Sequence, residues 1–494
     1  MTFSLIDLAV ILPEMLLILY ACVILLFEPF LPSSRKEILA YASLVALALA
    51  GFASFRLIHL DYTAFSGMYL LDPFSTFFKF LLYVAAALVV LLSMNYIKIE
   101  KINLGEYYAF LLIATAGMMV MVSGGDLITI YLGLELTSIC FYVLAGFKRY
   151  EERSTEASAK YFVLGSFSSG GLLYGISILY GLAGTTNLRD LARFFAAAPH
   201  TGSAMAFPAG ALISSEGTLI VAMVLLTVGF GFKVAAVPFH MWTPDVYEGA
   251  PTPITAFLSV SSKAASFAVF LRVFLSVFGS VQQDWQAILI VLSVVTMGLG
   301  NLVAIAQENI KRMLAYSSIA HAGYAMIGLV VGDKFGIYSL MLYLMIYAFM
   351  NLGAFGVVIL LQRGGMSGEA ISDFTGLSKK HPFYALLMMV FMFSLAGLPP
   401  TAGFVAKFNV FMAAVNAHLA WLAVVGVVFS AISAYFYLRI VMVMYMKEPS
   451  DETMLAPSPA LSIALLVAVV VVVLIGIFPG PLIDYAQTAI LPIR

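Results

Sequence analysis

The chain contains 494 residues, of which 62% are hydrophobic and only 10% are charged, and its formal net charge is −1. A soluble protein of this length could not cover its surface with so few polar side chains, so the composition excludes the soluble globular class. The net charge is close to zero and argues neither for nor against an acidic partner. For a membrane protein of this composition we expect no nucleic-acid partner.

Apolar segments long enough to cross a hydrocarbon core of about 30 Å recur along the whole chain. Each must satisfy its own backbone hydrogen bonds in lipid, so we predict an all-α polytopic membrane protein. The first segment lacks a basic n-region and a cleavage site, which indicates a retained helix. The predicted spans number about fourteen and cover residues 6–27, 38–58, 71–95, 106–123, 127–147, 157–182, 217–239, 252–276, 285–306, 312–331, 336–361, 382–414, 418–445 and 456–479.

Lysine and arginine are enriched in the loops on one side of this arrangement, which places both termini outside the cytoplasm. Glu14 and Lys79 lie near a span end or in an outer helix, and we expect interfacial or subunit-contact charges there. The three tryptophans fall near span ends, as expected for interfacial anchors: Trp242, Trp285 and Trp421.

Four ionisable residues stand alone in the middle of apolar spans. Glu135 is the only charge in residues 127–147, Lys233 is the only one in 217–239, and Lys263 is the only one in 253–271. Lys407 occupies the twelfth span. Each such charge costs about 2.5–3.5 kcal/mol at a bilayer centre, and a functional site is the usual reason for that cost.

Two predicted spans are interrupted. The segment 382–414 is too long for one helix and contains Gly-Leu-Pro-Pro-Thr-Ala-Gly at 397–403, which predicts a broken helix. The seventh span ends at Pro238, within about two turns of Lys233. Broken helices at membrane depth are tolerated where their backbone lines a polar cavity, and in transporters they mark the ion site.

The spans also indicate an internal duplication. Residues 106–276 and 285–445 each hold five spans with a lysine-bearing broken segment as the fourth, and an odd number of spans makes the two units inverted repeats. Residues 1–105 then form the first three spans, and 446–494 contain the last. Between spans six and seven, Asn187–Ala198 is predicted to be a surface helix, followed by a linker to Ser215.

The chemistry of the buried charges favours protons over metal ions. Desolvation lowers the pKa of a lysine and a nearby carboxylate raises it, so a Glu/Lys pair can load and release a proton. One glutamate and three lysines provide no oxygen cage for sodium or calcium. Cys22 and Cys140 are too few for an iron–sulfur ligand set, so we expect no metal or cofactor in this chain. Hydroxyls and an imidazole suited to holding water chains lie near the charges: Thr227, Ser259, Ser261, Ser262 and His321.

Four strings resemble the antiporter-like proton-channel subunits of respiratory complex I. They are YLGLELTSICFYVLAG (131–146), GFKVAAVPFHMWTPDVYEGAPTPITAFLSVSSKAA (231–265), NIKRMLAYSSIAHAGY (309–324) and LAGLPPTAGFVAKF (395–408). The resemblance covers roughly residues 120 to 440. Within the family the chain is most similar to the subunit N type, which pairs fourteen spans with lysine on the broken twelfth.

The resemblance implies a role for each residue. Glu135 would modulate Lys233, Lys263 would be the central relay, Lys407 would act in the second half-channel, and His321 would be a relay member. It also implies a bacterial inner-membrane location, partner subunits in the membrane and at its surface, membrane lipid, and protons as the substrate. NADH, FMN, iron–sulfur clusters and quinone would belong to other subunits.

Two other functions remain open. One is a subunit of a multisubunit cation/proton antiporter of the same fold, and the other is a membrane scaffold with structural ion pairs. A structural pair is the alternative role for Lys233 with Glu135, and packing is the alternative for His321. His240, Asp245 and Glu248 are expected to make capping and loop hydrogen bonds.

Overall fold

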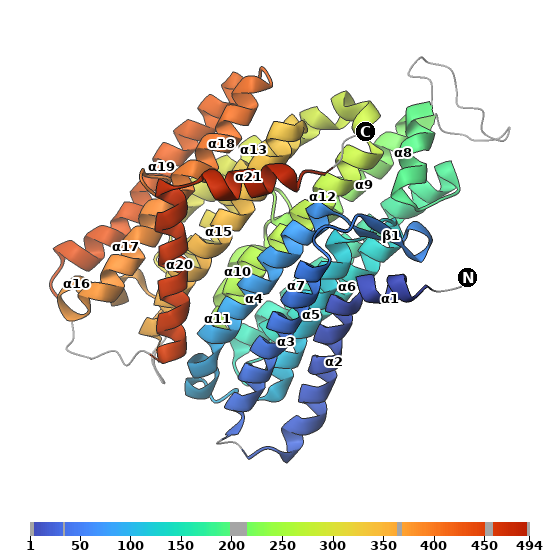
Figure 1. The fold of residues 1–494 in the computed structure, drawn as a ribbon. Helices are drawn as coiled ribbons and strands as arrows, with labels where there is room; N and C mark the ends of the chain where they lie inside the picture. The colour runs from blue at the N-terminus through green and yellow to red at the C-terminus, as the bar shows by residue number, and fades with distance from the viewer. Residues whose placement is uncertain (1–3, 33–34, 198–214, 363–367, 450–457, 492–494) are drawn as a thin grey trace.

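The computed structural model describes residues 4–32, 35–197, 215–362, 368–449 and 458–491, and its long helices run roughly side by side (Figure 1). Within this part of the chain, thirteen helices are long and apolar enough to cross a membrane. The remaining predicted span, the twelfth, consists of two shorter apolar helices. The all-α membrane fold is therefore confirmed, and thirteen of the fourteen predicted spans correspond to helices of spanning length.

The N-terminal part departs from the prediction at two points. The first span is divided at Ile11, because Pro13 begins a second helix there. A small antiparallel hairpin of β1 (Tyr62–Ala64) and β2 (Tyr69–Leu71), with the turn η3 (Phe65–Gly67), joins the second and third spans. The helices of this part are α1 (Leu5–Val10), α2 (Leu12–Phe27), η1 (Glu28–Phe30), α3 (Glu37–Arg56) and α4 (Pro73–Ile99).

The first five-span unit begins with four helices and a surface helix. They are α5 (Gly105–Val122), α6 (Leu127–Ala145), α7 (Glu152–Ala183), the surface helix α8 (Leu188–Ala197) and α9 (Ser215–Val234). Helix α8 confirms the predicted helix between spans six and seven, whereas most of the linker after it lies outside the described residues. Helix α9 ends directly after Lys233, where Ala235 has a φ of 61°, and the short helix α10 (Trp242–Gly249) follows. The predicted break in the seventh span is thus present.

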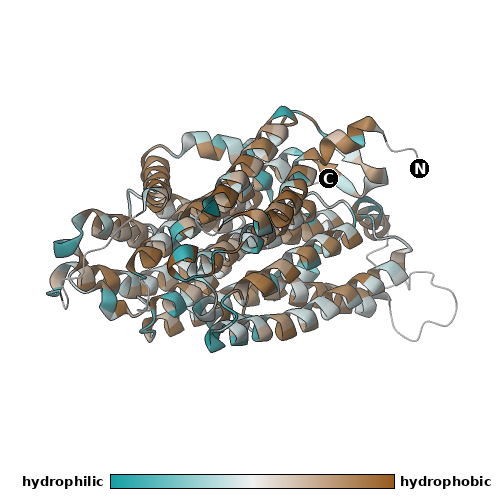
Figure 2. Cartoon of the chain, turned by 90° about the horizontal axis from the view of Figure 1, so that it is seen from below, coloured by the Kyte–Doolittle hydropathy of each residue, from teal (hydrophilic) through white to brown (hydrophobic). Residues whose placement is uncertain are grey.

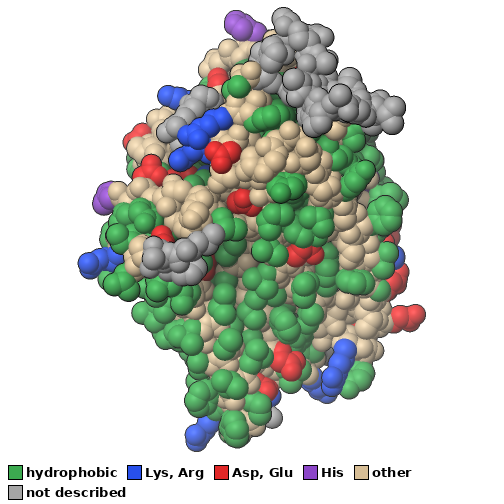
Figure 3. Space-filling view, turned by 90° about the vertical axis from the view of Figure 1, so that its right-hand side faces the viewer, with side chains coloured by type: hydrophobic (Ala, Val, Ile, Leu, Met, Phe, Trp, Pro, Cys, Tyr) green, Lys and Arg blue, Asp and Glu red, His purple; other side chains and the backbone are tan. Residues whose placement is uncertain are grey.

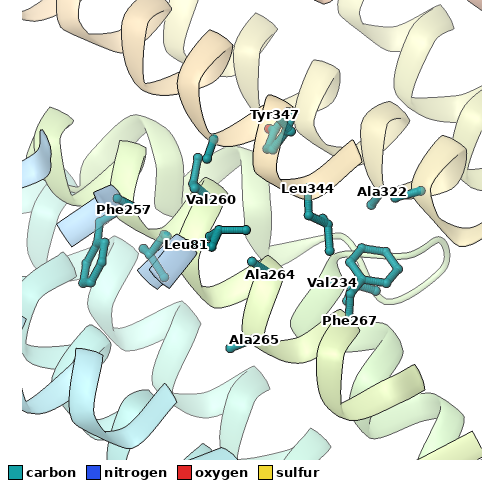
Figure 4. Packing of buried hydrophobic residues seen from close by; sticks show 14 of the residues in the cluster. Leu81, Val234, Phe257, Val260, Ala264, Ala265, Phe267, Ala322, Leu344 and Tyr347 are labelled. Carbon is teal, nitrogen blue, oxygen red and sulfur yellow. The ribbon is translucent and has the colours of Figure 1, made fainter. Parts of the chain in front are cut away.

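The eighth span is the most enclosed part of the first unit. It consists of α11 (Thr252–Phe257), the π-helical turn η4 (Leu258–Ser262) and α12 (Lys263–Val277). Figure 4 shows Phe257, Val260, Ala264 and Phe267 of this span among buried side chains of neighbouring elements, including Leu81 and Tyr347. Lys263 therefore lies in a tightly packed apolar region.

The second unit repeats the plan of long helices followed by a broken one. Helix α15 is buried along its length and packs against both halves of the broken span and against α20. In Figure 1, the terminal helix α21 lies across the long helices. The elements from the end of the first unit onward are η5 (Gly279–Val281), α13 (Gln282–Ile305), α14 (Ile310–Val331), α15 (Lys334–Leu361), η6 (Ile371–Phe374), α16 (Leu377–Lys380), α17 (Pro382–Ala396), α18 (Ala402–Asn416) and α19 (Ala420–Met446). The C-terminal helices α20 (Pro459–Ile477) and α21 (Gly480–Thr488) follow the second unit.

The outer surface suits lipid or neighbouring apolar chains. Hydrophobic residues line most of the long helices (Figure 2), and they cover much of the face seen in Figure 3. The anchor role predicted for two tryptophans is wrong. Trp242 and Trp285 are buried, and their indole nitrogens donate 3.0 Å hydrogen bonds to the carbonyl oxygens of Phe232 and Phe278. They satisfy backbone groups at helix ends, whereas Trp421 is exposed as expected.

Candidate functional site

The three predicted lysines are all buried in helices, and each amine has polar partners. Lys233, Lys263 and Lys407 are 4%, 3% and 4% exposed. In the described part of the chain their hydrogen-bond acceptors are hydroxyls and backbone carbonyls. Such partners accept a hydrogen bond from a charged or a neutral amine. Lys233 and Lys263, with one and two hydrogen bonds, can keep them on losing a proton, whereas Lys407 donates three and gives up one, since a neutral amine has two N–H groups.

Lys233 lies in the last turn of α9, directly before the break. Its Nζ donates a 2.7 Å hydrogen bond to Ser138 Oγ on α6 and lies 6.0 Å from the ring centroid of Tyr161. A small cavity joins this amine to the eighth span, and its polar lining includes Thr137, Ser138, Lys233, Ser262 and Ser266. Met118, Met121, Leu134 and Phe141 also line this cavity, which has room for one water molecule at most.

Glu135 lies on α6, less than one turn from Ser138, and is only half-buried. Its Oε1 has no hydrogen-bond partner among the described residues. On the same helix, Leu132 and Ile139 are 61% and 55% exposed, so Glu135 borders an outward-facing surface. The Lys233 amine of α9 therefore approaches the turn of α6 that carries Glu135, and its direct partner in that turn is Ser138.

Lys263 begins α12 immediately after the π-helical turn. Its Nζ donates hydrogen bonds to Ser318 O at 2.6 Å and to Ser318 Oγ at 2.5 Å. Within the turn, Ser259 Oγ accepts a 2.5 Å hydrogen bond from Asn351 Nδ2 of α15. π-Helical turns occur often at functional sites, and this one was not predicted because hydropathy carries no signal for it.

His321, on α14, is hydrogen-bonded on both ring nitrogens. Its Nδ1 is 2.6 Å from the Tyr343 hydroxyl and its Nε2 is 3.1 Å from the Tyr437 hydroxyl. Tyr437 also shares a hydrogen bond with Ser317, next to the residue that binds Lys263. The sequence did not reveal Tyr343 and Tyr437, because an uncharged tyrosine in an apolar span resembles a packing residue.

Lys407 lies on α18 and binds the end of the other half of its broken span. Its Nζ donates to Leu395 O at 3.0 Å, to Ala396 O at 2.9 Å and to Ser430 Oγ at 2.9 Å. Gly397, which ends α17, has a φ of 86°, a conformation that favours glycine. The predicted interruption is confirmed, and the backbone carbonyl groups of Leu395 and Ala396 at the end of α17 accept hydrogen bonds from the lysine amine.

A second group of buried charges was predicted wrongly as interfacial. Glu14 and Lys79 form a salt bridge of 2.8 Å in which both side chains are 1% exposed. Tyr69 joins the pair, because its hydroxyl donates to Glu14 Oε1 at 2.6 Å and accepts from Lys79 Nζ at 2.6 Å. The two charges compensate each other across α2 and α4. Because these helices are far apart in the chain, the sequence does not indicate the pairing.

Asp72 and Arg272 form another buried ion pair. Asp72 caps the start of α4, and Arg272 lies near the C-terminal end of α12. The guanidinium donates to both carboxylate oxygens, at 2.8 and 3.0 Å. Burial alone raises the pKa of the Asp72 carboxyl, but the Arg272 guanidinium and the Ser75 backbone amide hold that pKa below its ordinary value. The pair fastens the N-terminal helices to the eighth span. The described residues contain no group of three or more His, Cys, Asp or Glu residues that could hold a metal ion.

Comparison with known proteins assigns the family. Residues 124–433 match the family model for NADH:quinone oxidoreductase/Mrp antiporter, transmembrane. NADH-quinone oxidoreductase subunit N 2 of Rhizobium meliloti is 47% identical over 475 residues, which cover 96% of each chain. NADH-quinone oxidoreductase subunit N of Trichlorobacter lovleyi is 46% identical over 492 residues, 99% of this chain and 98% of the relative.

Solved structures agree with this assignment. A chain of respiratory complex I from Thermus thermophilus superposes with a TM-score of 0.78 at 32% identity, covering 96% of this chain and 98% of that one. A chain of the Mrp complex from Dietzia sp. shares the fold, with a TM-score of 0.83 at 20% identity over 98% of this chain and 97% of that one. The chain belongs to the NADH:quinone oxidoreductase/Mrp antiporter transmembrane family and, within it, to the NADH-quinone oxidoreductase subunit N relatives.

Proposed function

We propose that this chain is the proton-translocating membrane subunit N of a bacterial NADH–quinone oxidoreductase. Protons cross the inner membrane through Glu135, Lys233, Lys263, His321 and Lys407, while other subunits reduce quinone. The observation that supports this most directly is the setting of the three buried lysines. Each lies beside a helix irregularity: the end of α9, the π-helical turn η4, and the break between α17 and α18.

The two five-span units serve as half-channels. Residues 106–276 hold Glu135, Lys233 and Lys263, and residues 285–445 hold His321 and Lys407. Ser318, which accepts from Lys263 of the first unit, lies on α14 of the second unit, and the hydrogen-bonded group of Ser317, Tyr437, His321 and Tyr343 continues the relay within that unit. Hydroxyl and imidazole groups that both donate and accept hydrogen bonds suit proton transfer through ordered water.

The redox chemistry belongs to partner subunits. NADH, FMN, iron–sulfur clusters and quinone would bind there, and this chain contributes the proton path alone. The complex as a whole is a translocase. The alternative, a subunit of a multisubunit cation/proton antiporter, shares this fold, but the identity to the Mrp chain is far lower than that to the subunit N relatives.

The test is proton pumping by the assembled complex. Lys233→Ala and Lys263→Ala should each strongly reduce proton uptake into inside-out membrane vesicles while quinone reduction by ionophore-treated vesicles stays measurable. Purification of the native complex should recover flavin and iron–sulfur subunits with this chain. Native pumping in both variants at normal assembly, or a complex that lacks redox subunits, would overturn the proposal.

A further inference from the structure

The short helix α10 lies at the cytoplasmic end of the fold under the predicted orientation, and charged residues hold it in place. Lys311 donates from Nζ to the carbonyl oxygens of Glu248 and Ala250, at 2.6 and 2.9 Å. Arg312 donates to Asp245 Oδ1 at 2.9 Å and to Glu248 Oε2 at 2.7 Å. Both carboxylates remain partly exposed. Helix α10 is therefore a fixed cap that carries acidic groups at the membrane surface.

Tyr247 connects this cap to the buried interior. Its side chain is fully buried, and its backbone oxygen accepts a 2.8 Å hydrogen bond from Thr255 Oγ1 of the eighth span. Its hydroxyl has no hydrogen-bond partner among the described residues, and α10 packs directly against α14, the helix that carries Ser318. Ser318 is the residue that accepts both hydrogen bonds of Lys263. The helix whose Ser318 binds the central lysine thus also packs against the cap helix.

Several buried polar atoms around this connection have no hydrogen-bond partner among the described residues. They share a position between the cap helix and the eighth and eleventh spans: Thr252 Oγ1, Tyr247 OH, Ser261 Oγ, Tyr347 OH and Asn351 Oδ1. Their elements pack against one another, with α10 on α11, and α15 on both α11 and η4. Buried polar groups are almost always hydrogen-bonded, so ordered water is the partner that fits these atoms.

From this arrangement we propose that Tyr247 is the proton-uptake residue that connects the cytoplasmic face to Lys263, through Ser318, Tyr347 and ordered water. Protons enter from the medium beside the Asp245 and Glu248 carboxylates, which are paired with Lys160 and Arg312. They pass along water to the Tyr247 hydroxyl and reach the Lys263 amine by way of Ser318. Each hydroxyl and each water on the route accepts one proton and donates another, so only the Lys263 amine gains a proton, which the medium supplies. The inference rests on the proposed function and adds the side and the residue of entry.

Tyr247→Phe tests it, because this change removes only the hydroxyl and keeps the ring. Tyr107→Phe is the matched control: Tyr107 is also fully buried, and its hydroxyl bonds Ser93 at 2.8 Å on α4, away from the route. In inside-out vesicles, where the cytoplasmic face meets the medium, Tyr247→Phe should slow pumping about tenfold or more. The loss should grow as the medium becomes more alkaline and shrink as it becomes more acidic, because uptake becomes the slow step.

Equal pumping rates and pH profiles for Tyr247→Phe and Tyr107→Phe at equal assembly would overturn the inference. If Lys263→Ala abolishes pumping while Tyr247→Phe pumps normally, only the uptake route fails; if both pump normally, the proposed function fails. Should Tyr247→Phe not assemble, Tyr347→Phe provides the same comparison, with the same alkaline loss expected. A high-resolution structure of the complex with no water at the Tyr247 hydroxyl would also contradict it.

Discussion

The Lys233 amine donates a 2.7 Å hydrogen bond to the hydroxyl of Ser138, on the helix that carries Glu135. Glu135 is half-buried and forms no salt bridge with Lys233 among the described residues, so we expect any influence of its charge on the amine to act through space. A charge placed in this way is free to respond to a neighbouring subunit. Under the proposed function, we expect the pair to act as a switch between the edge of the chain and its interior.

Glu135→Gln should slow proton pumping at unchanged assembly, since the amide keeps the shape of the carboxylate and removes its charge. Ser138→Ala should cause a smaller loss, because the cavity around Lys233 offers other hydroxyls for the amine. Proton uptake by vesicles, divided by the rate of quinone reduction, measures both effects. Native ratios in the glutamine variant would show that Glu135 has only a structural role.

Gly403→Ala should destabilise the break in the twelfth span. A Cβ at this position would lie 1.7 Å from the backbone oxygen of Ser394, so α18 must move away from α17 and carry Lys407 with it. We expect a loss of about 1–3 kcal/mol or more in the stability of the complex, together with reduced pumping. Thermal denaturation of the purified complex measures the first effect.

Gly181→Ala, in α7, is the matched control for that substitution, because a Cβ there has no heavy atom within 4 Å. In a helix interior it should be neutral or stabilise by about 0.5–1 kcal/mol. Equal behaviour of the two alanine variants would contradict the close approach of the two half-helices.

Asp72→Asn should leave the buried Arg272 guanidinium without a counter-charge, at a cost of about 3–5 kcal/mol. Asparagine still caps the start of α4, so the substitution isolates the ion pair from the cap. The pKa of Asp72 is lowered in the folded chain, so the contribution of the pair is complete above the ordinary aspartate value of about 3.9. This stabilising contribution is lost only as the pH falls through the lower pKa that Asp72 has in the folded chain.

The difference in melting temperature between the parent complex and Asp72→Asn should accordingly be constant from about pH 5 to 8. Asp333→Asn is the control, since Asp333 caps α15 through the Gly336 amide and has no ion pair among the described residues. A difference for Asp72→Asn that shrinks between pH 7 and 5, or one no larger than that for Asp333→Asn, would refute the assignment.

The sequence predicted the charged centres of the site because a lone ionisable residue in an apolar run is visible to hydropathy. Lys233, Lys263 and Lys407 stand out in this way, and proline and glycine showed both helix breaks. The same reasoning failed for Glu14 and Lys79, since their partnership depends on helices far apart in the chain meeting in space. Pairing of distant helices leaves no local trace in one sequence.

Uncharged members of the site were missed for a related reason. Tyr343, Tyr437 and Tyr247 lie in segments where a tyrosine packs as readily as it relays, and only the positions of their hydroxyl groups distinguish the two roles. The π-helical turn before Lys263 likewise depends on backbone hydrogen bonding that residue types do not determine. Trp242 lies near a span end as predicted, but tertiary packing turned its indole inward.

The central claim is that the buried lysines act by losing and regaining a proton, and Lys407→Arg tests it most directly. Arginine keeps the positive charge and can still donate to the carbonyl groups that end α17, but it does not release its proton in a protein. We predict that the number of protons pumped per electron falls to the level of Lys407→Ala, with both complexes fully assembled. An arginine variant that pumps at the native ratio, with quinone reduction still coupled, would show that Lys407 is a fixed positive charge and would contradict the account.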